Sequence, residues 1–281
     1  NLRLRQPKHE KGQLMNTLLI SLLLILQFQS HEAGTFLSPA CGPRHGGVYV
    51  VAHRGAHEGI PENTLAAYRH AIELGADFVE IDLRETKDGH LVSMHNTTVD
   101  TYTKDATGNV EEFTLEELKA LDIGSRVGPE WAEERIPTFE EIMEVCKGKI
   151  GIYLDLKHAD VEKVLAVIHK YEMEKDIVWY AGTPQLRQVQ EQCPECLLMP
   201  EVGSGENLSR TIKFFAPKVA ASTWDNLSEA VVKSCHEAGI KLIVDDGGPD
   251  TWNDLLSWGV DGIQTDDVDG LIERLKETKA P

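Results

Sequence analysis

From residue 48 to residue 278, short apolar runs rich in β-branched residues alternate with segments of helical periodicity. The eight apolar runs are 48–52, 78–83, 150–156, 177–181, 197–202, 219–222, 242–245 and 262–265. The helical segments that follow them lie near 63–74, 138–146, 160–172, 184–192, 206–215, 228–238, 250–258 and 267–278. This alternation is typical of parallel βαβ units, so we predict an α/β chain of eight consecutive strand–helix pairs.

Eight parallel strands within about 230 residues favour a closed (β/α)₈ TIM barrel, because an open sheet of that size would leave edges to protect. One connection, 85–137, is too long for an ordinary loop after a strand. It contains a predicted hairpin, in which 86–89 turn into a strand at 91–95, and a short helix at 115–121. We expect 85–137 to form a small insertion between the second strand and the following barrel helix.

Two strings are typical of capping boxes that open helices. Thr-Leu-Glu-Glu occurs at 114–117, and Thr-Phe-Glu-Glu occurs at 138–141. In this motif the threonine accepts a hydrogen bond from the backbone three residues later, and the glutamate returns one.

We predict that residues 1–43 are a leader and that 44–281 are the barrel domain. The apolar run at 17–26 follows four basic residues and is too short to span a bilayer, which is typical of a signal peptide. We therefore expect export to a periplasm or the extracellular space, and no stable membrane span. A buried N-terminal helix is the alternative, and a poor lipobox-like string leaves lipid attachment at Cys41 open.

The chain carries a formal net charge of −18, from 46 acidic and 28 basic residues. A surface of that sign repels nucleic acid and anionic membranes, so neither is an expected partner. An anionic small-molecule substrate would need a cation, or local Arg and Lys, to reverse the field inside a cleft.

The five cysteines match no disulfide framework. Cys193 and Cys196 form a single C-x-x-C string, without the second pair or the thioredoxin-like context that a zinc or redox site would need. We expect either a local disulfide or two ordinary thiols there.

Polar residues gather at the carboxyl ends of the predicted strands, where barrel enzymes carry their active sites. His53 and Arg54 end the first strand, Glu80 and Asp82 the second, Asp155 and Lys157 the third, and Thr265 and Asp266 the eighth. Because side chains alternate along a strand, Glu80 and Asp82 share one face, and so do Asp155 and Lys157.

If those faces point into the barrel mouth, the carboxylates of Glu80, Asp82 and Asp155 converge. Three like charges at close range are costly without a cation. A hard divalent ion with oxygen ligands resolves the repulsion, so we expect one Mg²⁺ or Ca²⁺.

Two histidines, His53 and His95, complete the expected apparatus. One can act as base and the other as acid near neutral pH. A metal ion together with Arg54 and Lys157 can neutralise phosphate oxygens. The set therefore indicates hydrolysis of a phosphodiester.

Each residue alone has a simpler explanation. Glu62 and Asn63 can start a helix, with Asn63 as its cap, and Arg54 can pair with Glu62. Several nearby polar residues are expected to be solvated, namely His57, Asp88, His90, His158, Asp245 and Asp246.

The motifs, in their order, resemble those of the glycerophosphodiester phosphodiesterases. They are H-R-G at 53–55, P-E-N-T at 61–64, E-I-D at 80–82, D-G-x-L-V-x-x-H at 88–95, L-D-L-K at 154–157 and G-V-D-G-I-x-T-D at 259–266. The resemblance spans roughly 48–275 and implies a (β/α)₈ barrel with a small insertion. It also implies a divalent metal at Glu80, Asp82 and Asp155, acid–base catalysis by His53 and His95, and phosphate binding by Arg54 and Lys157.

The chain departs from the family pattern at three places. Asn96 follows His95 where the family commonly has Asp, so the partner of that histidine lacks charge. Asp155 stands where the family often has Glu, which should draw the ion toward its strand or admit a water. Residues 244–248 replace an aromatic residue at the mouth, and Trp224 either supplies an aromatic surface or simply packs.

We therefore expect metal-dependent hydrolysis of glycerophosphodiesters to glycerol 3-phosphate and an alcohol. The alternatives are a phospholipase D-type hydrolase acting on lysophospholipids or sphingolipids, and a catalytically silent binding barrel. No strongly apolar loop in 85–137 offers a lipid chain an entry path.

Overall fold

The computed structural model describes residues 42–205 and 207–277. Apart from residues 42 and 43, the predicted leader lies outside these ranges, as does Cys41. Within them, no helix combines the length and apolar character that crossing a bilayer requires.

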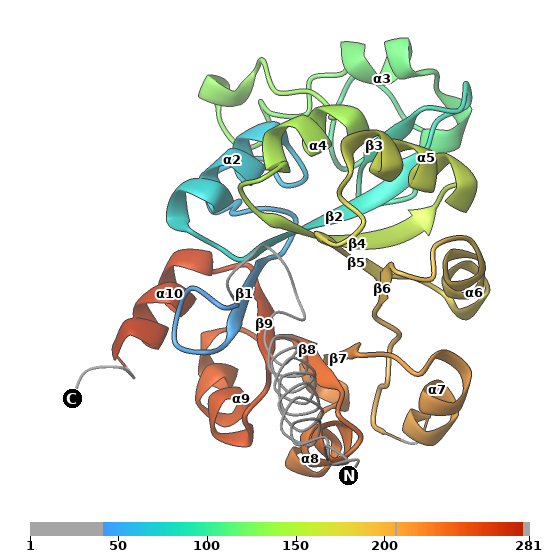
Figure 1. Cartoon of the computed structure of the whole chain (residues 1–281). Coiled ribbons are helices and arrows are strands. Elements are labelled where there is room, and N and C mark those ends of the chain that lie inside the picture. Colours follow the sequence, from blue (N-terminus) through green and yellow to red (C-terminus); the bar gives the residue numbers. More distant parts are fainter. Residues whose placement is uncertain (1–41, 206, 278–281) are drawn as a thin grey trace, which may run out of the picture. The chain divides into compact units, whose positions relative to one another are not determined.

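Eight parallel strands form the ring at the centre of Figure 1, in the order β6-β5-β4-β2-β1-β9-β8-β7. They are β1 (Tyr49–Ala52), β2 (Phe78–Glu85), β4 (Gly151–His158), β5 (Ile177–Tyr180), β6 (Leu197–Leu198), β7 (Val219–Thr223), β8 (Lys241–Asp245) and β9 (Gly262–Thr265). The predicted strands and their parallel pairing are confirmed.

The ring closes between β6 and β7, where the strand pairing is weakest. There Glu201 and Ala221 form an isolated parallel bridge. Ala221 N donates to Pro200 O at 3.0 Å, and Val202 N donates to Ala221 O at 2.9 Å. The predicted (β/α)₈ barrel is confirmed as a nearly closed one.

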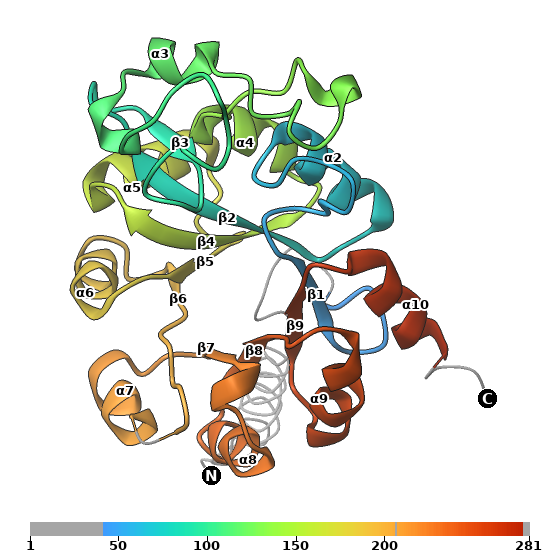
Figure 2. The same cartoon turned by 180° about the vertical axis from the view of Figure 1, so that it is seen from behind.

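Helices alternate with the strands and cover the outside of the ring in both views (Figures 1 and 2). They are α2 (Leu65–Leu74), α4 (Phe139–Cys146), α5 (Val161–Tyr171), α6 (Thr183–Gln192), α7 (Leu208–Phe215), α8 (Glu229–Glu237), α9 (Trp252–Trp258) and α10 (Val268–Glu277). The larger apolar core lies between their inner faces and the outward side chains of the strands. Burial of this interface is the main source of the barrel's stability.

The inside of the ring changes character along the strands. Its interior core comprises Tyr49, Val51, Phe78, Tyr153, Val178, Met199, Val219, Ala221 and Ile243. Because side chains point inward at every second position, the next inward positions toward the carboxyl ends carry the polar residues. The barrel is therefore filled by apolar side chains below and polar ones at its mouth.

Between β2 and α4, the chain contains β3 (Leu91–Ser93), η1 (Val110–Glu112), α3 (Leu115–Ala120) and η2 (Pro129–Trp131). The predicted hairpin is present, because β3 pairs antiparallel with β2. Both capping boxes are present as well, at Thr114 and Thr138. This segment has its own small apolar core, which includes Val99, Tyr102 and Leu118.

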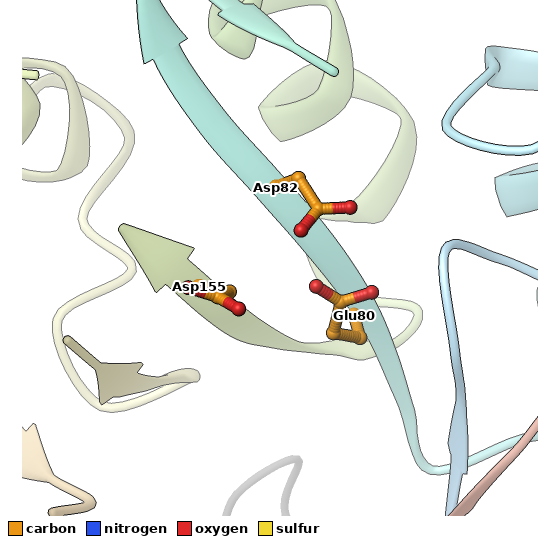
Figure 3. Close-up of side chains that lie close together, drawn as sticks. All are labelled: Glu80, Asp82 and Asp155. Atoms are coloured by element: carbon orange, nitrogen blue, oxygen red, sulfur yellow. The ribbon is translucent and has the colours of Figure 1, made fainter. Parts of the chain in front are cut away.

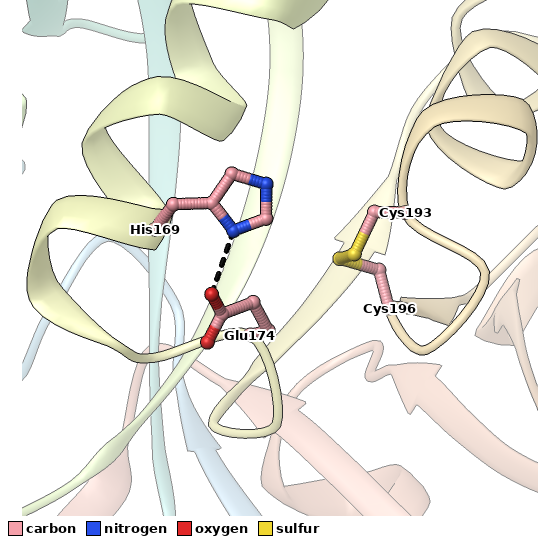
Figure 4. The surroundings of a disulfide bond; sticks show 4 residues. All are labelled: His169, Glu174, Cys193 and Cys196. Atoms are coloured by element: carbon pink, nitrogen blue, oxygen red, sulfur yellow. Dashed lines mark hydrogen bonds and ion pairs between the residues drawn. A yellow bond between two sulfur atoms is a disulfide. The ribbon is translucent and has the colours of Figure 1, made fainter.

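Cys193 and Cys196 form a disulfide between α6 and β6, with Cα atoms 5.4 Å apart (Figure 4). Of the two alternatives at this C-x-x-C string, the structure has the local disulfide. Nearby, Nδ1 of His169 lies 2.6 Å from Oε1 of Glu174 and closes the end of α5.

Candidate active site

Three carboxylates from two adjacent strands meet at the barrel mouth. Glu80 and Asp82 project from β2 and Asp155 from β4 (Figure 3). One ligand oxygen from each lies within 4.8 Å of the others. The parallel register pairs Asp82 with Asp155 directly, which brings the two strands' carboxylates to one level. The predicted convergence is therefore present.

The electrostatics of this cluster fit a divalent cation. Burial raises the pKa of Glu80 well above its usual value, and the charges of Asp82 and Asp155 raise it further. Burial also raises the pKa of Asp155, which Lys157 opposes. Oδ1 of Asp82 is buried and has no hydrogen-bond partner among the described residues. Mg²⁺ and Ca²⁺ bind such all-oxygen donor sets, and a bound ion would also contact this buried oxygen.

The two predicted phosphate-binding cations lie beside the carboxylates. Nζ of Lys157 is 2.6 Å from Oδ2 of Asp155. It also forms an ion pair with Oδ1 of Asp82 at 3.1 Å, in a geometry that does not make a hydrogen bond. Burial works to lower the pKa of Lys157, but Asp82 and Asp155 hold it above its usual value. Nη1 of Arg54 is 3.1 Å from Oε1 of Glu62, so this pair forms as the sequence suggested. Both cations border the cavity at the mouth.

The loop after β1 explains the H-R-G motif. Gly55 has φ +85°, and a Cβ there would lie 2.7 Å from Cβ of Ala67 in α2. Glycine thus allows the loop to press against the helix, which holds His53 and Arg54 at the mouth. The backbone N–H of Arg54 donates to Oε2 of Glu80 at 2.8 Å and ties the loop to the carboxylate cluster.

The prediction that Asn63 caps the helix is wrong. Thr64 is the N-cap of α2, and its side chain accepts from the N–H of Ala67. Asn63 is buried and donates from Nδ2 to Oδ2 of Asp82 at 2.7 Å. Its own oxygen accepts from the hydroxyls of Tyr68 and Ser93. Asn63 therefore orients a carboxylate of the site. The sequence could not show this, because the direction of the amide depends on how the residue is buried in the fold.

Each predicted catalytic histidine has a partner on Nδ1. Nδ1 of His53 lies 2.7 Å from Oδ1 of Asp266 and donates to it, because a carboxylate only accepts. Nδ1 of His95 lies 2.9 Å from Oδ1 of Asn96. Asn96 donates from Nδ2 to Thr101, which leaves Oδ1 as the acceptor for His95. This leaves Nε2 of both histidines available to a ligand in the cavity, which both residues line.

The cavity at the mouth has a volume of about 250 Å³ and extends beyond the predicted residues. Its lining also includes Tyr180, Glu201, Asp245 and Gln264, which the sequence analysis did not select. The period of two that selected Glu80 and Asp82 also points these residues inward. The sequence alone does not show where each short strand ends or how the ring closes, and both decide which inward residues reach the cavity.

Three further expectations need correction, because Asp245, Asp246 and His57 are only partly exposed. Asp245 is half-buried in the cavity wall, not solvated. Asp246 accepts from Nε1 of Trp252 at 2.5 Å, so it also has a structural role. Nδ1 of His57 lies 2.9 Å from the carbonyl oxygen of His53. The other residues expected to be solvated, namely Asp88, His90 and His158, are exposed.

Trp224 does not line the cavity. Its ring stacks on that of Trp258, with centroids 5.4 Å apart and planes inclined by 10°. Of the two alternatives for this residue, packing is the one found.

Comparison with known proteins gives consistent results. The sequence matches the glycerophosphoryl diester phosphodiesterase family over residues 53–270. A glycerophosphodiester phosphodiesterase of Caldanaerobacter subterraneus is 35% identical over 241 residues, which cover 81% of this chain and 98% of that protein.

Solved structures show the same architecture. A glycerophosphodiester phosphodiesterase from Agrobacterium tumefaciens has a TM-score of 0.72 at 27% identity, covering 80% of this chain and 99% of that one. A phosphodiesterase from Oleispira antarctica, solved with the product sn-glycerol-3-phosphate, has a TM-score of 0.76 at 24% identity, covering 82% and 96%. The second likeness is one of fold.

Proposed function

Because this chain belongs to the glycerophosphoryl diester phosphodiesterase family and is a phosphoric diester hydrolase, we propose that it cleaves glycerophosphodiesters to glycerol 3-phosphate and an alcohol with one divalent cation. The observation that carries the proposal is the approach of Glu80, Asp82 and Asp155 within 4.8 Å at the mouth of the barrel. These three residues would hold Mg²⁺ or Ca²⁺. When bound, the ion would supply positive charge to the phosphate oxygens.

The side chains of this site divide the remaining tasks. Arg54 and Lys157 bind the phosphate and orient it beside the carboxylates, because a guanidinium and an ammonium both donate to phosphate oxygens. Their acidic neighbours keep both cations charged, since the pKa of each is raised. Glu62 limits where Arg54 can reach through the 3.1 Å contact.

His53 and His95 accept and donate the protons of the reaction at Nε2. Hydrolysis requires one proton to leave the attacking hydroxyl and one to reach the departing alkoxide. Asp266 fixes the ring of His53 and can stabilise the positive charge of a ring that accepts a proton. The Asp266 side chain is 69% exposed, so water screens this pair and orientation is its main contribution. Asn96 fixes the ring of His95 without adding charge.

The test is release of glycerol 3-phosphate from glycerophosphocholine by the purified protein, with Mg²⁺, Ca²⁺, or no added ion. We expect turnover that stops in excess EDTA and returns when the ion is restored. His53→Ala should lower kcat by at least about 10³-fold, while the matched change His70→Ala, on the outer face of α2, should leave it unaltered.

Activity that persists in excess EDTA would remove the metal from the mechanism. Cleavage of lysophospholipids, with glycerophosphodiesters left intact, would instead support the phospholipase D-type alternative. Ligand binding without turnover in the wild type would support the silent barrel.

We also propose that the protein is exported. The apolar run at 17–26 behind basic residues is typical of a signal peptide, and the Cys193–Cys196 disulfide suits an oxidising compartment. Lipid attachment at Cys41 remains part of this proposal.

A further inference from the structure

One half of the barrel mouth is not used by the proposed reaction. We call it the acidic half and define it by Tyr180, Glu201, Asp245 and Gln264. Tyr180 ends β5, Asp245 ends β8, Gln264 lies in β9, and Glu201 follows β6 at the bridge to Ala221. All four line the same cavity as the carboxylate cluster. Among the described residues, no lysine or arginine lines this half.

Among the described residues, the two carboxylates of the acidic half have no lysine or arginine beside them in the cavity. Burial raises the pKa of Glu201, and the charge of Asp245 adds to that rise against hydrogen bonds from Gly203 N and the Tyr180 hydroxyl. Burial raises the pKa of Asp245 as well, which His53 and a hydrogen bond with Gln264 oppose. Two half-buried carboxylates that repel each other favour a positively charged ligand.

Gln264 gives an independent indication of a ligand. Its side chain is part of the cavity wall, and the residue is only 6% exposed. Its Oε1 is buried and has no hydrogen-bond partner among the described residues. A buried acceptor without a donor is unfavourable unless a bound molecule donates to it.

The chemistry of the ligand follows from these groups. Glu201, Asp245 and Oε1 of Gln264 all accept hydrogen bonds. A primary ammonium has three N–H donors, no acceptor and one positive charge. It therefore matches the number of accepting groups and is opposite in charge to the two carboxylates. The ring of Tyr180 adds an aromatic surface that a cation can approach. A neutral polyol could donate to the same atoms but would leave both charges uncompensated.

We propose that the acidic half binds the ammonium group of an amino alcohol, so that the preferred substrates are glycerophosphodiesters of the ethanolamine type. This inference rests on the proposed function for the cleavage step. The phosphate then lies between Arg54 and Lys157, and the amine, two carbons beyond the ester oxygen, reaches the acidic half of the same cavity.

Three diesters that share the glycerol phosphate portion test the proposal. The alcohol portion of glycerophosphoethanolamine carries a positive charge and N–H donors. That of glycerophosphocholine carries a positive charge without N–H donors, and that of glycerophosphoglycerol carries neither. We expect kcat/KM for glycerophosphoethanolamine to exceed that for glycerophosphoglycerol by at least about tenfold, with glycerophosphocholine between them, since hydrogen bonds to charged groups are worth that factor.

Two variants assign the preference to the acidic half. Asp245→Asn and Glu201→Gln should each reduce the ratio of the two kcat/KM values to within about threefold, because each removes one charge and keeps the shape. Asp250→Asn, at an exposed aspartate in the segment that follows β8, is the matched control and should keep the wild-type ratio.

A wild-type ratio near one would overturn the proposal. So would an equal loss of kcat/KM for all three diesters in Asp245→Asn, because the acidic half would then hold the shared glycerol portion.

Calorimetric titration of His53→Ala protein with the same diesters, in Ca²⁺, separates this inference from the hydrolase function. Tighter binding of glycerophosphoethanolamine that is lost on adding Asp245→Asn would support the ammonium site even if the wild type turned over no diester. Equal affinities for the three would refute it.

Discussion

At the scale of single residues, two members of the site have a strained backbone. Arg54 and Asn63 both have φ near +55°, a conformation that side chains other than glycine rarely adopt. The N–H of Asn63 donates to the carbonyl of Arg54 at 2.9 Å, so the two strained residues hold each other. The arrangement aims the N–H of Arg54 at Glu80 and the amide of Asn63 at Asp82. Such strain persists because several contacts fix it at once.

Glu80 allows a prediction about stability and pH. Its raised pKa means that the metal-free folded protein binds a proton that the unfolded chain has lost, at any pH between the ordinary value of 4.5 and the raised one. Stability therefore falls as the pH rises through that window. Glu80→Gln removes the charge, so metal-free Glu80→Gln protein should melt at a higher temperature than metal-free wild type at pH 7. Near pH 4 the difference should vanish.

Calorimetry in EDTA measures this effect, and the same variant should lose at least about 10³-fold in kcat when metal is supplied. Glu73→Gln, at an exposed site on α2, is the control and should change neither quantity. A collapsed melting temperature in Glu80→Gln at pH 7 would show that Glu80 is structural.

At the scale of elements, the segment between β2 and α4 supplies more than His95. The hydroxyl of Tyr102 donates to Oε1 of Glu62 at 2.9 Å, and the same oxygen accepts from Arg54. Arg126 lies over the Tyr102 ring, 4.9 Å from its centroid. This segment therefore helps to hold Glu62 in place, and Glu62 in turn contacts the cation proposed to bind phosphate.

Tyr102→Phe tests this role, because it removes the hydroxyl and keeps the ring. We expect KM to rise about three- to tenfold with kcat little changed, because one partly buried hydrogen bond behind Arg54 is lost. Tyr171→Phe removes a similar hydroxyl that donates to Glu144, on the helical shell far from the mouth, and should leave KM unchanged. An unaltered KM in Tyr102→Phe would exclude a positioning role, and a large drop in melting temperature with proportional loss of kcat would make the residue structural.

At the scale of the whole molecule, the ring combines stability and function in one interior. Its lower part is apolar and holds the strands together, while its mouth gathers carboxylates that the net charge of −18 disfavours. The half-buried cations Arg54 and Lys157 offset part of that charge on one side of the cavity. Among the described residues, no lysine or arginine offsets the charge of the acidic half, so a cationic group of the substrate complements it.

The proposed export is also a property of the whole chain. In cells that make the protein, we expect the mature form outside the cytoplasm, lacking part of residues 1–43 and with Cys193 and Cys196 bridged. Fractionation, mass spectrometry of the N-terminal peptide and alkylation before and after reduction measure all three. The buried thiols Cys146 and Cys235 are the internal control, since they should react only after unfolding, with or without reductant. Cytoplasmic protein with an intact leader and free Cys193 would contradict the proposal.

Much of this protein was determined by local sequence. Short apolar runs indicated the strands, and helical periodicity with capping threonines indicated the helices, because both depend on residues close in the chain. The period of two within each strand placed Glu80 beside Asp82, and Asp155 beside Lys157, on inward faces.

Only the tertiary structure decided which distant residues meet. The pairing of His53 with Asp266 and the path from Tyr102 through Glu62 to Arg54 join segments far apart in sequence. The approach of Glu201 to Asp245 likewise depends on the closed ring. These contacts follow from strand order, register and ring closure, which arise from packing of the whole barrel and leave no periodic trace in the chain.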